Sequence, residues 1–384
     1  GDFSSGQIWR AAPETNGSWQ SKSLQRTDYL ISSFATDLSG ELFLLDYASG
    51  GIYELTADSD RSTVSNISPP ALLSDHPCVE TLTPQFKLAP GAIPFTINHP
   101  FWSDGAGKSR HLYLPEGSTI QVDANGDFEF PTGTILIKTF WKANKRIETR
   151  FLVRSNTAWS GHNYQWSPDQ RNATRITSGG SKPAADGSPW YFPAPEQCQS
   201  CHTSAAKGAL GLELTQLTSI DVPTTVGRVD QLTQWTALNL FADNTHSPSG
   251  QPLQVAFAPL PNRPTGAELN NDTYKPTNDN IAAYLHVNCS SCHRPGSTAP
   301  TAFDLRFDTM WPDKGLCDTP VLGSTLGLAN PTILNPGNPD NALLYIRPNR
   351  RDSAAMPPQS GLFADPYITI GVRNWMTSLS NCPN

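Results

Sequence analysis

The sequence predicts an α+β protein with a β-rich N-terminal half, made of hairpins and an antiparallel sandwich, and an α-helical C-terminal half. In the first half, short runs of β-branched and aromatic residues are bounded by glycine and proline, which is typical of strands. From Trp190 onward, apolar residues recur at helical spacing instead. Because the chain has 384 residues, we expect more than one domain. The predicted segments are residues 1–65, 86–190, 191–270 and 271–384.

The composition is typical of a loop-rich exported protein. Charged residues make up only 16% of the chain, and there are 34 prolines. The net charge is −7 and no basic run occurs, which argues against nucleic acid or an anionic membrane as a partner. No apolar run approaches the roughly 20 residues that a membrane-spanning helix needs. We therefore expect no transmembrane segment.

The first segment is predicted to contain β-hairpins. Its apolar, β-rich runs are short, and Gly50-Gly51 lies between the last two. A glycine turn between two such runs predicts a hairpin. Residues 66–85, which are punctuated by prolines, are predicted to be a linker. The predicted strands are residues 7–10, 31–34, 41–46 and 52–55.

The second segment is predicted to be an antiparallel sandwich. Residues 133–141 are rich in β-branched and aromatic side chains, and residues 146–154 alternate polar with apolar as a half-buried strand does. Residues 159–166 predict a further aromatic strand. No helical pattern separates these strands, which favours antiparallel pairing.

The acidic stretch at residues 123–129 is compatible with a hairpin turn or a calcium loop. It lacks the bidentate Glu that a calcium loop carries at its twelfth position. Asn125-Gly126 is a strong hairpin signal. We therefore expect a turn, and a calcium ion has no support beyond these acidic residues.

Four helices are expected in the C-terminal half. The second includes an amphipathic run that begins at Asp230, and Asn278-Asp279 is the expected N-terminal cap of the third. The fourth has an apolar face that includes Ile368, Val372 and Trp375. The predicted helices are residues 208–217, 228–241, 281–286 and 365–379.

Two short motifs carry the chemistry of the sequence. Both have the pattern C-x-x-C-H, which is the attachment signal for c-type haem. The two thiols add to the haem vinyl groups as thioethers, and the histidine binds the iron. A four-cysteine zinc site could also use two C-x-x-C pairs, but it leaves both histidines unexplained. We therefore expect two covalently bound haem c groups, held by Cys198, Cys201 and His202 and by Cys289, Cys292 and His293.

Cysteines Cys78, Cys317 and Cys382 lie outside the motifs. An odd number allows one disulfide and one free thiol. Cys317–Cys382 would join the middle of the last segment to its end, whereas Cys78–Cys317 would join two segments. The sequence does not decide between these pairings. Because c-type haem is attached outside the cytoplasm, a disulfide is permitted.

The last segment resembles a class I cytochrome c. In that fold, a helix runs into C-x-x-C-H and a terminal helix packs across it, as residues 281–293 and 365–379 are expected to do. The resemblance implies that Met356, in the proline-rich loop Met356-Pro357-Pro358, is the sixth ligand of the second iron. A thioether ligand raises the reduction potential of haem.

The sixth ligand of the first iron is less clear. His286 precedes Cys289 by one helical turn and could reach a haem edge, a propionate or the other iron. We take bis-histidine ligation as the working hypothesis. An open or water-bound iron would instead permit small-ligand or peroxide chemistry. The candidate histidines are His76, His99, His111, His162, His246 and His286.

A wider resemblance covers the chain from about residue 86 to its end. The matching stretches include Phe101-Trp-Ser-Asp-Gly-Ala106, both C-x-x-C-H motifs and Met356-Pro-Pro358. They are similar to a family of di-haem cytochromes c found C-terminal to sorbosone-dehydrogenase-like β-propellers, and residues 31–55 resemble one propeller blade. The resemblance implies extracytoplasmic electron transfer coupled to a partner oxidoreductase.

We therefore expect a periplasmic or secreted di-haem cytochrome that transfers electrons between a partner oxidoreductase and an acceptor. The partner is expected to be a dehydrogenase domain or another cytochrome. We expect an electron-transfer module more than a stand-alone enzyme. The alternatives are a di-haem peroxidase-like enzyme with an open first haem, and a redox module of a polysaccharide-degrading system.

Overall fold

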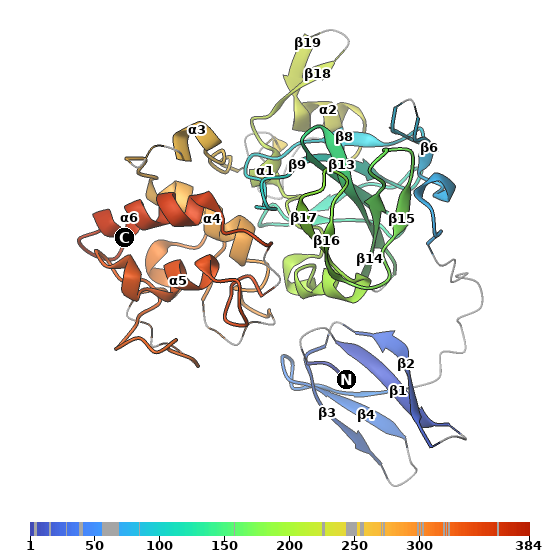
Figure 1. Cartoon of the computed structure of the whole chain (residues 1–384), viewed down its shortest axis with the longest axis horizontal. Coiled ribbons are helices and arrows are strands. Elements are labelled where there is room, and N and C mark those ends of the chain that lie inside the picture. Colours follow the sequence, from blue (N-terminus) through green and yellow to red (C-terminus); the bar gives the residue numbers. More distant parts are fainter. Residues whose placement is uncertain are drawn as a thin grey trace.

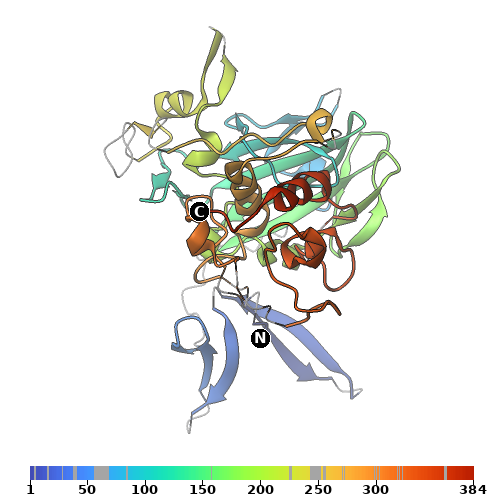
Figure 2. The ribbon, with the colours of Figure 1, turned by 90° about the vertical axis from the view of Figure 1, so that its left-hand side faces the viewer.

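Figure 1 shows the computed structural model of the chain. It describes residues 1–384 except 4–5, 15–16, 28, 38–40, 56–68, 84, 157, 225–226, 243–251, 254–256, 270, 272, 298, 300, 302, 318, 320, 322 and 359–360. The N-terminal strands form a lobe that lies apart from the rest in Figures 1 and 2. A large sheet and a group of helices make up the remainder.

The N-terminal lobe consists of two small antiparallel sheets, which confirms the predicted hairpins. One is the hairpin β1–β2, and the other has the strand order β3-β4-β5. Ile8, Ile31 and Leu44 form its small buried core. The strands are β1 (Gln7–Pro13), β2 (Trp19–Arg26), β3 (Ile31–Thr36), β4 (Leu42–Asp46) and β5 (Ile52–Glu54).

The large sheet has six antiparallel strands in the order β15-β14-β13-β12-β9-β8. Strands β12 to β14 are the three that the sequence predicts. Ala143 and Asn144 join β12 to β13 in a two-residue turn with φ of 46° and 61°, the backbone that tight hairpins require. The strands are β8 (Ile93–Phe95), β9 (Gly107–Tyr113), β12 (Ile135–Lys142), β13 (Lys145–Arg154), β14 (Trp159–Trp166) and β15 (Ala173–Arg175).

The predicted sandwich is wrong, because no second sheet of similar size faces the first among the described residues. The other strands of this part are two to four residues long and pair only as hairpins. They are β6 (Val79–Thr81) with β7 (Lys87–Leu88), β10 (Gln121–Val122) with β11 (Phe128–Glu129), and β16 (Gly180–Pro183) with β17 (Pro189–Phe192).

Both faces of the sheet are covered by other parts of the chain. On one face, Phe151 and Tyr164 pack with Leu73 of the 3-10 helix η1 (Leu73–Asp75), which lies in the predicted linker. The described part of that linker is therefore a packed segment. On the other face, Leu152 belongs to the same buried cluster as Trp235 of helix α2 (Gln231–Ala237).

The C-terminal half contains short helices separated by long loops. The predicted helix 208–217 forms only as α1, because Gly208 and Gly211 have φ of 74° and 80°, which helical residues do not adopt. The predicted helix 228–241 begins as a hairpin and is helical only in α2. These elements are η2 (Pro195–Ser200), η3 (Ser204–Ala206), α1 (Leu214–Leu217), β18 (Asp221–Thr224), β19 (Gly227–Asp230), α2 (Gln231–Ala237) and α3 (Gly266–Leu269).

The predicted third and fourth helices are present. Helix α4 is capped by Thr277, which accepts a hydrogen bond from the N–H of Asn280, so the cap lies one residue before the predicted one. The terminal helix starts as one π-helical stretch and continues as α6. The elements are α4 (Asn278–Cys289), η5 (Trp311–Lys314), η6 (Pro339–Asn341), α5 (Leu343–Asn349), η7 (Tyr367–Val372) and α6 (Arg373–Ser378).

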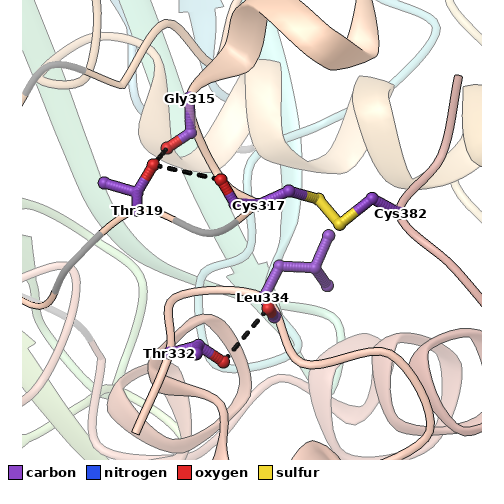
Figure 3. Close-up of a disulfide and its surroundings, with 6 residues drawn as sticks. All are labelled: Gly315, Cys317, Thr319, Thr332, Leu334 and Cys382. Atoms are coloured by element: carbon purple, nitrogen blue, oxygen red, sulfur yellow. Dashed lines mark hydrogen bonds between the residues drawn. A yellow bond between two sulfur atoms is a disulfide. The ribbon is translucent and has the colours of Figure 1, made fainter.

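A disulfide joins Cys317 to Cys382, with 6.2 Å between their Cα atoms (Figure 3). This selects one of the two pairings that the sequence left open. Cys78 stays a free, buried thiol. No helix in the described part of the chain has the length and apolar character needed to cross a membrane.

Candidate functional site

Both C-x-x-C-H motifs line one cavity of about 1010 Å³. Its walls come from the large sheet, from the loops that carry the two motifs, and from the loop after α5. The cavity therefore brings together residues that are far apart in the sequence. The predicted attachment and ligand residues all line it: Cys198, Cys201, His202, His286, Cys289, Cys292, His293 and Met356.

The first motif lies against strand β14 and the turn that follows η3. A Cβ atom on Gly161 would be 2.5 Å from Sγ of Cys198, so the strand must have a glycine here for the motif to pack. Nδ1 of His202 donates a hydrogen bond to the carbonyl oxygen of Gly208 at 2.5 Å. Among the described residues, Nε2 of His202 has no hydrogen-bond partner. This arrangement fixes the ring and leaves one nitrogen for a metal.

The second motif begins at the last residue of α4. The N–H of His293 donates to the carbonyl oxygen of Cys289 at 2.9 Å, which continues the turn beyond the helix. Nδ1 of His293 shares a hydrogen bond with Oγ1 of Thr301 at 2.8 Å. As at the first motif, no partner of Nε2 is found in the described part of the chain. The two histidines are thus held in the same way.

Burial keeps these side chains neutral. It lowers the pKa of His202 to about 4, with a further contribution from the nearby charge of Lys138, and it lowers the pKa of His293. A neutral imidazole is the form that binds metal. Burial also raises the pKa of Cys201 and Cys289 to about 12, unlike the lowered values of redox-active C-x-x-C thiols.

The two motif loops contact each other directly. Sγ of Cys292 donates to the carbonyl oxygen of Ser200 at 3.4 Å. The hydroxyl of Thr203 donates to the carbonyl oxygen of Ser291 at 3.1 Å. The guanidinium of Arg294 reaches the chain just after the first motif, as Nη1 donates to the carbonyl oxygen of Ala205 at 3.3 Å. The two attachment sites are therefore neighbours.

In the parts of the chain that are described, no group of three or more His, Cys, Asp or Glu side chains is arranged to hold a metal ion. The acidic stretch at residues 123–129 is a hairpin turn between β10 and β11, as expected. Oδ1 of Asp123 accepts the N–H groups of Asn125 and Asp127 at 2.8 and 3.1 Å, which occupies it as a turn cap.

A loop from the sheet side fixes the segment that follows Met356. Oδ2 and Oδ1 of Asp104 accept the N–H groups of Leu362 and Phe363 at 2.9 and 3.0 Å. Nε1 of Trp102 donates to the carbonyl oxygen of Phe363 at 3.2 Å. In the sequence, the motif that contains these residues stands out only by its resemblance to a family. An acidic residue before glycine indicates a turn, but it does not reveal which distant loop the carboxylate binds.

His286 is engaged at both ring nitrogens. Nδ1 accepts the N–H of Phe307 at 3.0 Å, so Nε2 carries the proton and donates to Glu213 at 2.7 Å. This geometry disfavours the predicted role of His286 as an iron ligand. Burial opposes ionisation of Glu213, but the neighbouring His286 holds its pKa below the ordinary value. His286 and Glu213 thus join α4 to the segment before α1.

Among the other candidate histidines that the structure describes, His162 borders the cavity, but its ring is hydrogen-bonded to His76. Nε2 of His76 donates to Nε2 of His162 at 3.2 Å, since Nδ1 of His76 already accepts the N–H of Cys78. Side chains alternate along a strand, so His162 points to the face opposite Gly161 and Cys198. Nδ1 of His99 bonds the carbonyl oxygen of Pro261 at 3.0 Å. His99 and His111 do not line the cavity, and His246 lies outside the described residues.

Comparisons of the chain with protein-family models, with curated proteins and with solved structures found no significant match. The function is therefore argued from the site.

Proposed function

We propose that the chain is a di-haem c-type cytochrome that transfers electrons. The observation that carries the proposal is that both C-x-x-C-H motifs line one cavity with each histidine held at Nδ1. Two thiols and one oriented, neutral imidazole are the donor set that c-type attachment uses. When bound, each haem would supply a one-electron Fe(III)/Fe(II) couple.

The protein residues support a role in passing electrons between two centres. The hydrogen bonds between the motif loops keep the two attachment sites next to each other. Met356 borders the same cavity and is the proposed sixth ligand of the second iron. The likeness to class I cytochromes c is supported by packing of α4 on the terminal helix, where the rings of Tyr284 and Tyr367 have centroids 4.7 Å apart.

The disulfide supports a periplasmic or secreted location for the protein, because structural disulfides are rare in the cytosol. We propose that the protein transfers electrons between a partner oxidoreductase and an acceptor. Both are expected to be proteins. A role within a polysaccharide-degrading system remains a prediction with no further support.

The first test is haem content after expression with a c-type maturation system. We expect two covalently attached haems by intact mass and by the pyridine haemochrome spectrum. Changing both Cys198 and Cys201 to Ala should remove one haem, and changing both Cys289 and Cys292 should remove the other. A chain that matures without covalent haem would refute the proposal.

One observation favours a second candidate function. Among the described residues, Met356 is the one methionine that lines the cavity. Of the histidines outside the motifs that line it, His286 is hydrogen-bonded at both ring nitrogens and His162 at Nε2. The first site is thus suited to small ligands, as in a di-haem peroxidase. Carbon monoxide binding to the reduced protein decides between the two. Uptake by one haem supports the peroxidase-like alternative, and no uptake supports a dedicated electron carrier.

A further inference from the structure

Four cationic side chains line the sheet side of the cavity. Lys138 on β12 lies opposite Arg110 on β9 and opposite Arg150 on β13. These three residues therefore form a row across adjacent strands, on one face of the sheet. Lys108 lies two residues before Arg110 and shares this face, because side chains alternate along a strand. We name these four residues the cationic row.

Among the described residues, one member of the cationic row, Arg150, has a carboxylate partner. Arg150 forms a bidentate pair with Glu148 at 2.9 and 2.8 Å. Glu148 also accepts from Nδ2 of Asn163 at 2.6 Å and from Nε1 of Trp190 at 2.9 Å, so both of its oxygens are in use. In the described part of the chain, no carboxylate forms an ion pair with the other three cations.

Enclosure of these charges without partners is costly. Arg110 is only 8% exposed. Burial lowers its pKa to about 10, and burial together with the charges of Arg110 and Arg150 lowers the pKa of Lys138 to about 7. Among the described residues, the hydrogen-bond acceptor of Lys108 Nζ is a neutral group, the carbonyl oxygen of Phe101. Buried charges normally occur in pairs, so the site is built to receive an anion.

We propose that the cationic row binds carboxylate groups inside the cavity, and that the two propionates of the haem on Cys198 and Cys201 are these carboxylates. The second half of this inference rests on the proposed function. Arginine side chains bind carboxylates with two parallel hydrogen bonds, which makes Arg110 the central residue of the site.

The position of the row fits this assignment. Arg150 lies near the first motif, because it shares a face of β13 with Leu152, whose partner Gly161 packs against Sγ of Cys198. Neighbouring strands are about 4.8 Å apart, so Arg110 lies about 10 Å from Arg150 across the sheet. The row therefore extends from the cysteines over about the breadth of a porphyrin. In haem c the propionates lie on the ring edge opposite the thioethers, which is where Lys108 and Arg110 would meet them.

The test uses the mature holoprotein with Arg110→Leu, Arg110→Lys and Arg171→Leu. Arg171 is the matched control, since its side chain is 82% exposed. A cation near the propionates favours the reduced iron. We expect Arg110→Leu to lower the reduction potential of one haem by about 59 mV, which is a tenfold shift of a one-electron equilibrium toward the oxidised form. The propionate bands of the resonance Raman spectrum should shift too, with Arg110→Lys retaining most of both signals and Arg171→Leu retaining all.

A second arm identifies the source of the carboxylate. The wild-type holoprotein is titrated with acetate, followed by the ferric absorption spectrum. Propionates as occupants predict no saturable change. A saturable change that Arg110→Leu abolishes, with unchanged propionate bands, would assign the row to a diffusible carboxylate and overturn the propionate assignment.

Failure of this inference is distinguishable from failure of the proposed function. Two covalent haems, with Arg110→Leu identical to wild type and no effect of acetate, would overturn the anion site alone. Absence of haem on Cys198 and Cys201 would overturn the proposed function, and with it the propionate assignment. Acetate binding to that protein would still test the row as a carboxylate site.

Discussion

The histidines of the two motifs depend on single hydrogen bonds to nearby loops. At the first motif the acceptor is the carbonyl oxygen of Gly208, a residue with φ of 74°. A Cβ atom at this position would lie 2.2 Å from Cδ1 of Trp159. The carbonyl is thus held by a backbone conformation and a close approach that both require glycine.

Gly208→Ala should therefore disturb the first motif. A left-handed backbone costs a residue with a Cβ about 1–2 kcal/mol, and the clash with Trp159 adds to this. We expect a loss of more than about 2 kcal/mol in the free energy of unfolding, measured with urea. The matched control is Gly117→Ala, where φ is 71° and no atom lies within 4 Å of the added Cβ. Equal losses in both variants would show that the approach to Trp159 has no role.

Met356→Leu should change only the second haem. Leucine conserves the volume but offers no sulfur, so the methionine-to-iron charge-transfer band should disappear and one reduction potential should fall. The control is Met310→Leu, because Met310 is 66% exposed and does not line the cavity. Retention of the band in Met356→Leu would remove Met356 from the proposed ligands.

The pair of His76 and His162 predicts a pH dependence of stability. Burial lowers the pKa of His162 to about 3, with a smaller contribution from His76. The folded form thus binds a proton less readily than the unfolded chain, whose histidine titrates near 6.5. The stabilisation is complete above pH 6.5 and is lost as the pH falls through about 3.

Urea unfolding of wild type and His162→Gln between pH 7 and pH 4 measures this effect. We expect the stability advantage of wild type to shrink by about 3 kcal/mol over this range, since one pKa unit is worth about 1.4 kcal/mol. A difference that stays constant with pH would mean that His162 binds a proton as readily in the folded protein as in the unfolded chain.

Among the elements, the loop with Trp102 and Asp104 and the loop after Met356 act as a pair. The carboxylate of Asp104 receives two backbone N–H groups, and hydrogen bonds to a charged acceptor contribute about 1.5–3 kcal/mol each. Asp104 has φ of 48°, which asparagine tolerates better than alanine.

Asp104→Ala should release the loop that carries Met356 while the haem content stays at two. We expect weaker methionine ligation, seen as a reduced charge-transfer band and a lower pH at which the band is lost on titration with alkali. Asp104→Asn keeps one acceptor oxygen and the backbone preference, so it should lie between the alanine variant and wild type. Normal ligation in Asp104→Ala would show that the loop holds its position without this contact.

The elements show where sequence patterns succeed. Strands β12 and β14 were predictable from their β-branched and aromatic residues, and β13 from its alternation of polar and apolar residues. Helix α4 was predictable from its cap and its apolar run. Strand β2 was missed, because its residues Ser21 to Ser23 are polar and exposed, and hairpin pairing with β1 alone holds it. The helix predicted at 208–217 failed because two glycines there serve turns.

At the scale of the whole molecule, the disulfide is the strongest restraint within the last segment. It closes a loop over a sequence separation of 65, for which chain entropy predicts about 4 kcal/mol of stabilisation. The double variant Cys317→Ser, Cys382→Ser should lose about this much, and its unfolding should no longer respond to a reducing agent. Cys78→Ala, which removes the free thiol, should still respond. A double variant as stable as wild type would contradict the prediction.

The site could be predicted from the sequence only in part. The motif residues were identified from residue type and spacing, which c-type haem attachment would require, and Met356 was identified from the resemblance to class I cytochromes c. Their meeting in one cavity depends on contacts between segments about 90 residues apart, such as that of Thr203 with Ser291 (|i−j| = 88). The cationic row could not be predicted from the sequence for a similar reason. Its members lie on three strands and become neighbours only through the register of the sheet.

The shared cavity has a consequence for the order of biosynthesis. Its walls come from segments that span most of the chain, from β9 to the loop after α5. If the proposed haems fill it, they form part of the protein interior, and a chain that closed first would shut the four thiols away from the attachment machinery. Ligation of the cofactors must then precede final compaction.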